Sequence, residues 1–283
     1  MHRPLSAFAV FLLVACGSSV AEGPPGTTGD SGAGTDTGGA TDTGVPAKAF
    51  KTHVILGDSI SDGGGESPFF YNLLDKNDDG KWPAEASHDF ATRYPGIQIQ
   101  KKSKGGATSA NLGGQIDALP TRLDGPIIVS ITIGGNDVQA ALPKFISGGG
   151  DDSKQRADFT ANLDNAHTKL HAPDRFGPGV QVTVVMTNIY DPSSGTGNFK
   201  GCGLPLSLWP AGKETGPILD NWEQIMVDAV KKFPGDVLLD MRAKFKGHGV
   251  ADAENWFVRD CIHPTAVGHN AIRGLFWDAV QKL

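Results

Sequence analysis

The chain has 283 residues, of which 39% are hydrophobic, and its formal net charge is −6. An acidic chain without a basic patch is not expected to bind nucleic acid. Once the atypical N-terminal stretch is set aside, the length fits one domain of ordinary size.

Residues 1–15 are predicted to be a lipoprotein signal peptide. An arginine near the start precedes a short apolar run at 7–15. This run falls short of the roughly 20 apolar residues that span a membrane, and it is typical of a secretory signal. The run ends at Cys16, in a context that resembles the lipobox of bacterial lipoproteins, so Cys16 is the predicted lipidation site. The alternative is an ordinary signal peptide cut near Ala15 or Ala21, with the cysteine incidental.

Residues 16–50 are predicted to be the lipidated cysteine followed by a flexible linker. Gly, Thr, Asp and Ser dominate this stretch, and large apolar residues are almost absent, so nothing in it offsets the entropy of ordering. Residues 51–283 are then the globular domain. This organisation predicts an exported bacterial lipoprotein, in the periplasm or at the cell surface, that contacts the membrane only through its N-terminal lipid anchor.

Predicted strands alternate with predicted helices along the globular domain. Runs rich in β-branched or alternating apolar residues predict strands at 53–56, 97–100, 127–133, 180–186 and 236–239. Apolar residues at helical spacing predict helices at 159–170, 218–233 and 266–283. The alternation predicts a three-layer α/β/α domain with a parallel sheet of about five strands.

Four polar motifs follow the predicted strands or lie near the C-terminus. They are Gly57-Asp58-Ser59, Gly105-Gly106-Ala107, Gly134-Gly135-Asn136-Asp137 and Asp260-Cys261-Ile262-His263-Pro264. Open parallel sheets bind ligands at the carboxyl ends of their strands, so we expect these motifs to meet at one edge of the sheet. Each motif alone is as well explained by a turn or a helix cap. Their combination in this order predicts an active site.

Together, the four motifs resemble the sequence blocks of the SGNH hydrolases, also called GDSL esterases and lipases. The resemblance covers about residues 53–283, and all four blocks are intact. It implies the flavodoxin-like SGNH fold and a serine esterase that uses neither a metal nor an organic cofactor.

The resemblance assigns a role to each candidate residue. Ser59 is the expected nucleophile, His263 the general base that takes its proton, and Asp260 the acceptor that orients the imidazole. The expected oxyanion hole consists of the backbone N–H groups of Ser59 and Gly106 and the side chain of Asn136. The adjacent glycine, residue 105, is the alternative to Gly106.

The substrate remains open at the sequence level. We expect a small-molecule or glycan ester, with short to medium acyl chains favoured. Within the same family the alternatives are a carbohydrate O-acetyl esterase and a lysophospholipase. The alternative of another class is a catalytically inactive surface protein that binds ligands on a hydrolase scaffold.

Two cysteines remain in the globular domain, and export favours a disulfide between Cys202 and Cys261. Two free buried thiols are the alternative. The bridge would pin the long Gly/Pro/Ser-rich stretch 188–212, which either walls the acyl pocket or buries its own apolar residues. These two roles are compatible.

Two further patterns carry less weight as metal sites. The run from Asp75 to Gly80 matches the first half of an EF-hand loop, but Ala86 stands where the bidentate glutamate belongs. We therefore expect a solvated acidic turn. His167 and His171 have the spacing of zinc ligands on a helix, but no third ligand is evident. We expect a polar helix face and no metal.

Overall fold

The protein is described by a computed structural model that covers residues 48–147 and 150–283. The predicted signal peptide, Cys16 and most of the linker lie outside the described residues. A five-stranded sheet with the order β2-β1-β3-β4-β5 runs through the described part, and every neighbouring pair is parallel. The strands are β1 (Thr52–Gly57), β2 (Gln98–Lys101), β3 (Ile127–Thr132), β4 (Val182–Thr187) and β5 (Val237–Leu239).

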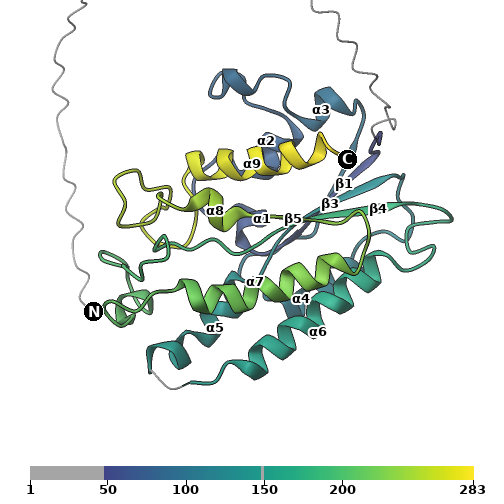
Figure 1. The fold of residues 1–283 in the computed structure, drawn as a ribbon. Coiled ribbons are helices and arrows are strands. Elements are labelled where there is room, and N and C mark those ends of the chain that lie inside the picture. Colours follow the sequence, from purple (N-terminus) through teal and green to yellow (C-terminus); the bar gives the residue numbers. More distant parts are fainter. Residues whose placement is uncertain (1–47, 148–149) are drawn as a thin grey trace, which may run out of the picture. The chain divides into compact units, whose positions relative to one another are not determined.

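Helices cover both faces of the sheet (Figure 1). One layer contains α2 (Phe70–Asp75), α3 (Phe90–Arg93), α8 (Met241–Phe245) and α9 (Ala266–Val280). The other contains α4 (Ser109–Asp117), α5 (Gly135–Ile146), α6 (Ser153–Leu170) and α7 (Gly216–Lys231). Shorter elements are α1 (Ser59–Asp62) and the 3₁₀ turns η1 (Pro83–Glu85) and η2 (Leu206–Leu208). The three-layer α/β/α fold predicted from the sequence is confirmed.

Alternating side chains on the strands enter two separate cores. On β1, Val54 and Leu56 pack with the α4/α6/α7 layer, whereas Ile55 packs with the α2/α9 layer. All six residues of β1 and of β3 are buried. Burial on both faces explains why these strands consist mainly of β-branched or aliphatic residues. Two of their buried polar side chains, His53 and Ser130, are hydrogen-bonded to each other at 2.9 Å.

The predicted strands and helices agree with the structure to within a few residues, except at the start of α6. That helix begins at Ser153, six residues before the periodic stretch that predicts it. Helices α2, α4 and α5 and the short helices α1, α3 and α8 were not predicted. Helix α4 contains Gly113 and Gly114, and α5 contains Pro143, and these residues obscure a helical pattern.

The carboxyl ends of β1 and β3 set the position of the site. Gly57, the last residue of β1, pairs in register with Thr132, the last residue of β3. Its φ is +117°, and a Cβ there would lie 1.9 Å from the carbonyl oxygen of Thr132. Glycine is therefore required at this point, and the chain turns directly into α1 with Ser59 as its first residue.

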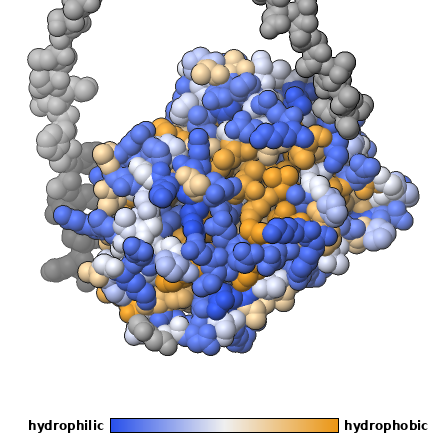
Figure 2. All heavy atoms as spheres, in the orientation of Figure 1, coloured by the Kyte–Doolittle hydropathy of each residue, from blue (hydrophilic) through white to orange (hydrophobic). Residues whose placement is uncertain are grey.

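Polar side chains cover most of the face seen in Figure 2, and apolar surface collects between the two helical layers, where the edge strand β5 lies. Within 48–147 and 150–283, no helix combines the length and the apolarity needed to cross a membrane.

Candidate active site

Three of the predicted site residues form one hydrogen-bonded chain. The Ser59 Oγ lies 2.7 Å from His263 Nε2, and His263 Nδ1 lies 2.6 Å from Asp260 Oδ2. In the matching neutral tautomer, the serine hydroxyl donates to the imidazole and the imidazole N–H donates to the carboxylate. Ser59 stands 204 residues before His263 in the sequence, so the fold alone brings them together.

The carboxylate of Asp260 is held in place by its own loop. Its Oδ1 accepts hydrogen bonds from the backbone N–H groups of Ile262 and His263, each at 2.9 Å. Partial burial opposes ionisation, but the hydrogen bonds from the His263 side chain and from these N–H groups outweigh it, so the pKa of Asp260 is lowered. The group therefore stays an acceptor, as stabilisation of an imidazolium requires.

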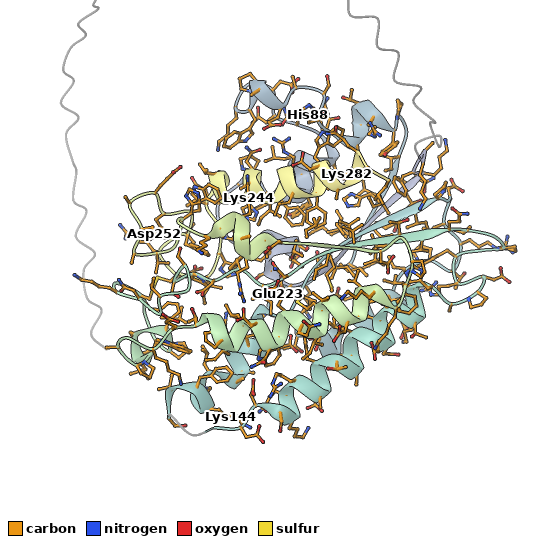
Figure 3. All side chains as sticks on the ribbon, viewed as in Figure 1. His88, Lys144, Glu223, Lys244, Asp252 and Lys282 are labelled. Atoms are coloured by element: carbon orange, nitrogen blue, oxygen red, sulfur yellow. A yellow bond between two sulfur atoms is a disulfide. The ribbon has the colours of Figure 1, made fainter. Side chains whose placement is uncertain are left out.

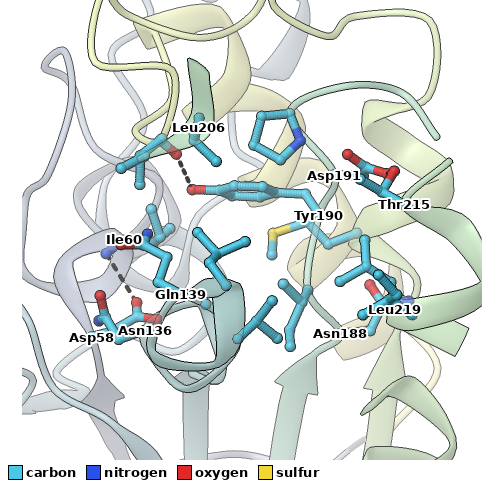
Figure 4. A pocket seen from close by; sticks show the side chains of 18 of the residues that line it. Asp58, Ile60, Asn136, Gln139, Asn188, Tyr190, Asp191, Leu206, Thr215 and Leu219 are labelled. Atoms are coloured by element: carbon cyan, nitrogen blue, oxygen red, sulfur yellow. Dashed lines mark hydrogen bonds between the residues drawn. The ribbon is translucent and has the colours of Figure 1, made fainter. Parts of the chain in front are cut away.

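Deeper anchors hold the same loop. The buried phenol of Tyr190 donates to the carbonyl of Ile262, the dashed bond that runs from Tyr190 in Figure 4. Burial raises the pKa of Tyr190 well above its usual range, so the phenol keeps its proton. The disulfide between Cys202 and Cys261 ties the loop to the stretch 188–212. The predicted cysteine pairing is thus present in the structure.

Gly105, Gly106 and Asn136 line the same pocket as Ser59 and differ in how their N–H groups are used. The N–H of Gly105 donates to Asp62 Oδ2 at 2.9 Å, whereas Gly106 makes no backbone N–H bond among the hydrogen bonds of the described residues. This difference favours Gly106 over its neighbour as the oxyanion donor. The Nδ2 of Asn136 donates one hydrogen to the carbonyl of Ala107 at 2.8 Å, which leaves its second hydrogen free. Residues 59, 105, 106, 136 and 263 line one shallow pocket.

Asp58 directly precedes Ser59 in the chain and is buried. Its Oδ1 accepts hydrogen bonds from the Thr132 hydroxyl at 2.8 Å and the Ile60 N–H at 3.1 Å. Burial raises the pKa of Asp58 to about 7, although these two bonds oppose the shift. Asp137 is also largely buried, and it accepts hydrogen bonds from the backbone and hydroxyl of Ser109. Both aspartates therefore hold turns of the site through these hydrogen bonds.

The raised pKa of Asp58 predicts a specific pH dependence of stability. A carboxyl whose pKa rises on folding stabilises the fold fully below its unfolded value of 3.8, and this contribution disappears as the pH rises through about 7. We expect the free energy of unfolding of wild type relative to Asp58→Asn to fall by roughly 4 kcal/mol from pH 4 to 8. Urea unfolding of both proteins across this range measures the difference, and parallel stability curves would contradict it.

Gly64 leaves the space that the His263 imidazole occupies. A Cβ at Gly64 would lie 2.4 Å from His263 Cδ2, 2.7 Å from Nε2 and 3.0 Å from the Ser59 Cβ. The first two separations are shorter than any van der Waals contact, so the imidazole ring must move if residue 64 gains a side chain.

We therefore expect Gly64→Ala to lower kcat for an ester by about 10²-fold, the cost of misplacing a reacting group by about 1 Å. The matched control is Gly274→Ala in α9, where an added Cβ meets nothing within 4 Å. Steady-state kinetics of both variants test the expectation. Full activity of Gly64→Ala would show that the ring is not confined as described.

An apolar groove runs from Ser59 between α5, α7 and the stretch 188–212 (Figure 4). Its cavity volume is about 110 Å³. Its apolar lining includes Ile133, Val138, Leu142, Phe145, Ile189, Phe199, Leu206, Trp209, Ile218 and Leu219. The long stretch 188–212 thus walls this groove and buries its own Phe199 and Trp209 at the same time, so both of its predicted roles hold.

Polar groups in the groove wall are largely paired with each other. Asp191 accepts hydrogen bonds from the Ser193 hydroxyl and the Gly195 N–H, and Thr215 also donates to it. The groove therefore presents hydrocarbon to a ligand, with its hydrogen-bonding groups concentrated at the Ser59 end. Most of this lining was not identified from the sequence, because its residues come from three separate elements.

The structure bears on the two weaker sequence patterns. In the EF-hand-like run, two carboxylates are hydrogen-bonded to side chains of the protein itself: Asp75 Oδ1 lies 2.6 Å from His53 Nδ1, and Asp79 Oδ1 accepts a hydrogen bond from Asn77 Nδ2 at 2.7 Å. The expectation that His167 and His171 lack a third partner is wrong. Asp236 lies against both rings, and it was missed because it comes from the start of β5.

Comparison with known proteins agrees with the fold. The GDSL-like Lipase/Acylhydrolase family matches residues 55–271, so the chain belongs to that family and is a carboxylic ester hydrolase. No curated protein matches the sequence.

Similar folds occur in solved structures of low sequence identity. An extracellular lipase from Streptomyces rimosus has a TM-score of 0.51 at 23% identity, and the match covers 82% of this chain and 99% of that one. LAE5, an alpha/beta hydrolase from the Lake Arreo metagenome, has a TM-score of 0.54 at 20% identity, covering 83% and 96%. Axe2, an acetylxylan esterase from Geobacillus stearothermophilus, has a TM-score of 0.51 at 17% identity, covering 83% and 95%.

Proposed function

We propose that this protein hydrolyses carboxylic esters of short to medium acyl chains through an acyl-Ser59 intermediate. The observation that carries the proposal is the Ser59–His263–Asp260 chain at the mouth of an apolar groove. These three hydrogen-bonded residues provide an activated nucleophile, and the groove provides an apolar site for the acyl chain next to it.

The proposed reaction has two halves. Ser59 Oγ attacks the ester carbonyl carbon while His263 Nε2 takes its proton, and the oxyanion accepts hydrogen bonds from the N–H groups of Ser59 and Gly106 and from Asn136 Nδ2. His263 then gives the proton to the leaving alcohol, and the acyl group stays on Ser59. His263 then deprotonates a water that attacks the acyl carbonyl carbon, the bond from that carbon to Ser59 Oγ breaks, and His263 returns the proton to Oγ as the acid leaves. Asp260 stabilises the imidazolium in both halves.

The character of the groove supports the preference for acyl length. Burying one methylene in an apolar site is worth about 0.8 kcal/mol, which is roughly fourfold in kcat/KM if the gain is realised in the transition state. A groove of this size and lining therefore favours butyrate and octanoate esters over acetate. Very long chains exceed it and gain nothing from the added carbons.

The test is a series of p-nitrophenyl acetate, butyrate, octanoate and palmitate with the whole chain. We expect kcat/KM to rise roughly fourfold per methylene at first and to stop rising before palmitate. A profile that is highest at acetate would contradict the preference and favour a carbohydrate O-acetyl esterase, which acetylated xylo-oligosaccharides would then test. Activity confined to lysophospholipids would identify the lysophospholipase alternative.

We also propose that the enzyme is an exported lipoprotein anchored through Cys16. The apolar run that ends at this cysteine and the Gly/Thr/Asp/Ser-rich stretch after it support the proposal. Radiolabelled palmitate should be incorporated into the wild-type chain in bacterial cells and be absent from Cys16→Ser. Equal labelling of both proteins would rule the anchor out.

A further inference from the structure

Two histidines and an aspartate converge at the edge of the sheet opposite to Ser59. His167 and His171 end helix α6, and Asp236 directly precedes β5. His167 Nδ1 lies 3.0 Å and His171 Nε2 lies 2.8 Å from the same oxygen, Asp236 Oδ2. One ligand atom from each residue lies within 4.8 Å of the other two. Because all strands are parallel, the start of β5 is at the amino-terminal edge, away from the active site.

The surroundings fix all three side chains. The exposed fraction is 1% for the His167 side chain and 0% for that of Asp236, whereas that of His171 is 19%. Asp236 Oδ1 accepts a hydrogen bond from the Val184 N–H of β4 at 2.8 Å, which orients the carboxylate. Both imidazoles stack on Phe233, with ring centroids 5.4 and 4.7 Å away. The group is preorganised, and His171 gives it access to solvent.

We propose that this cluster binds one divalent transition-metal ion of the zinc class. The ligands are His167 Nδ1, His171 Nε2 and Asp236 Oδ2, and a water on the exposed side of His171 completes the set. Two imidazoles and a carboxylate suit Zn²⁺ and its neighbours, whereas Ca²⁺ and Mg²⁺ prefer oxygen ligands alone. The bond from Val184 N–H supplies the outer-sphere partner that ligating carboxylates usually have.

The distances fit an ion after a small adjustment. Ligand atoms about 2.0–2.1 Å from a common ion lie roughly 2.8–3.4 Å apart for bond angles between 90° and tetrahedral. The two N···O separations of 2.8 and 3.0 Å are at the lower end of that range, and all three ligand atoms lie within 4.8 Å of one another. The N···O separations can therefore stay nearly as they are, and the two ring nitrogens must lie within roughly 3.4 Å of each other around the ion.

The tautomers can adapt without loss of other bonds. To bind an ion, His167 must move its proton from Nδ1 to Nε2, and within the described part of the chain that Nε2 has no hydrogen-bond partner. Nε2 of His167 lacks a hydrogen-bond partner among the described residues in either tautomer. Coordination through Nδ1 therefore adds no new unpaired nitrogen on this ring. The shift keeps the ring neutral, as a metal ligand must be.

Such an ion would cross-link the elements that carry its ligands. It joins the end of α6 to the start of β5 and, through Asp236, to β4. Since these elements lie away from Ser59, we expect the ion to stabilise the fold and to be dispensable for ester hydrolysis. The zinc site and the proposed ester hydrolysis are therefore tested separately, because either result can be negative without the other.

The test is zinc binding by the whole purified chain after removal of metals with EDTA. Competition with a chromophoric chelator should show one Zn²⁺ per chain, and Co²⁺ in its place should give visible absorption bands. At a zinc concentration 100-fold above Kd, we expect Tm to rise by roughly 5–10 °C. Ester hydrolysis should be the same before and after zinc is added.

Two variants and one control make the test specific. His171→Gln and Asp236→Asn should each weaken zinc binding by more than about 100-fold, beyond what loss of an outer partner costs. Asn keeps an oxygen for Val184 N–H, and unchanged ester hydrolysis checks that both variants fold. The control is His88→Gln, because His88 pairs with Glu85 on the other helical layer (Figure 3). This variant should leave zinc binding unchanged. No stoichiometric zinc uptake by wild type, or equal uptake by both variants, would overturn the proposal.

Discussion

Replacing Ser59 by alanine is expected to lower kcat for p-nitrophenyl butyrate by roughly 10⁴–10⁶-fold. Alanine removes only the hydroxyl that lies 2.7 Å from His263 Nε2, so the groove and the other residues of the site stay in place. No acyl-enzyme can form without Oγ, and the residual rate reports the oxyanion donors and binding alone. KM should change little, because the alcohol and acyl portions keep their contacts.

The control for this change is Ser207→Ala. Ser207 is exposed on η2, in the stretch that walls the groove, and it should keep the wild-type rate within a factor of two or so, as surface substitutions usually do. Circular dichroism and urea unfolding verify that Ser59→Ala is folded. A folded Ser59→Ala protein with the wild-type rate would mean that another group carries the hydrolysis.

Replacing His263 by alanine should cost about as much as losing Ser59, because the serine is a poor nucleophile without its base. The informative protein is the double variant Ser59→Ala/His263→Ala. Residues that act as one unit are strongly non-additive, so the double variant should be no slower than the single ones. If Ser59 and His263 contributed independently, the kcat loss of the double variant would be the product of the two single losses.

The pH profile of the same series adds a second readout. The pH dependence that a general base gives the wild-type rate should be absent from the residual rate of His263→Ala. A residual rate that keeps the wild-type pH profile would assign the base role to another group.

The sheet and the nucleophile could be predicted because their signals are local. Strands buried on both faces are largely apolar runs, and β3 is such a run from Ile127 onward, interrupted by Ser130 and ended by Thr132. Ser59 and His263 each lie inside a short motif that joins a turn to a chemically active side chain. Those motifs can be recognised without knowledge of how the chain folds.

Features that depend on distant segments could not be predicted. Asp236 meets His167 from 69 residues away, and nothing in its own neighbourhood marks it as a partner. The groove was likewise invisible, since Leu142, Trp209 and Ile218 come from α5, the stretch 188–212 and α7. Helix α5 itself was missed because Pro143 lies inside it, although its first turn carries Asn136.

Packing also decides the role of glycines that look alike in the sequence. Gly63, Gly64 and Gly65 form an unbroken run, and only the structure singles out the middle one as the residue that would clash with the catalytic imidazole. The same holds for residues 105 and 106, whose N–H groups differ in whether Asp62 already engages them.

The most direct test of the acyl-Ser59 account is covalent labelling with a fluorophosphonate, which phosphonylates an activated serine and releases fluoride. Intact-mass analysis should show one adduct per chain, peptide mapping should place it on Ser59, and the adduct should be absent from Ser59→Ala and strongly slowed in His263→Ala. A preparation that hydrolyses esters but carries no adduct on Ser59, or carries it on another residue, would contradict the account.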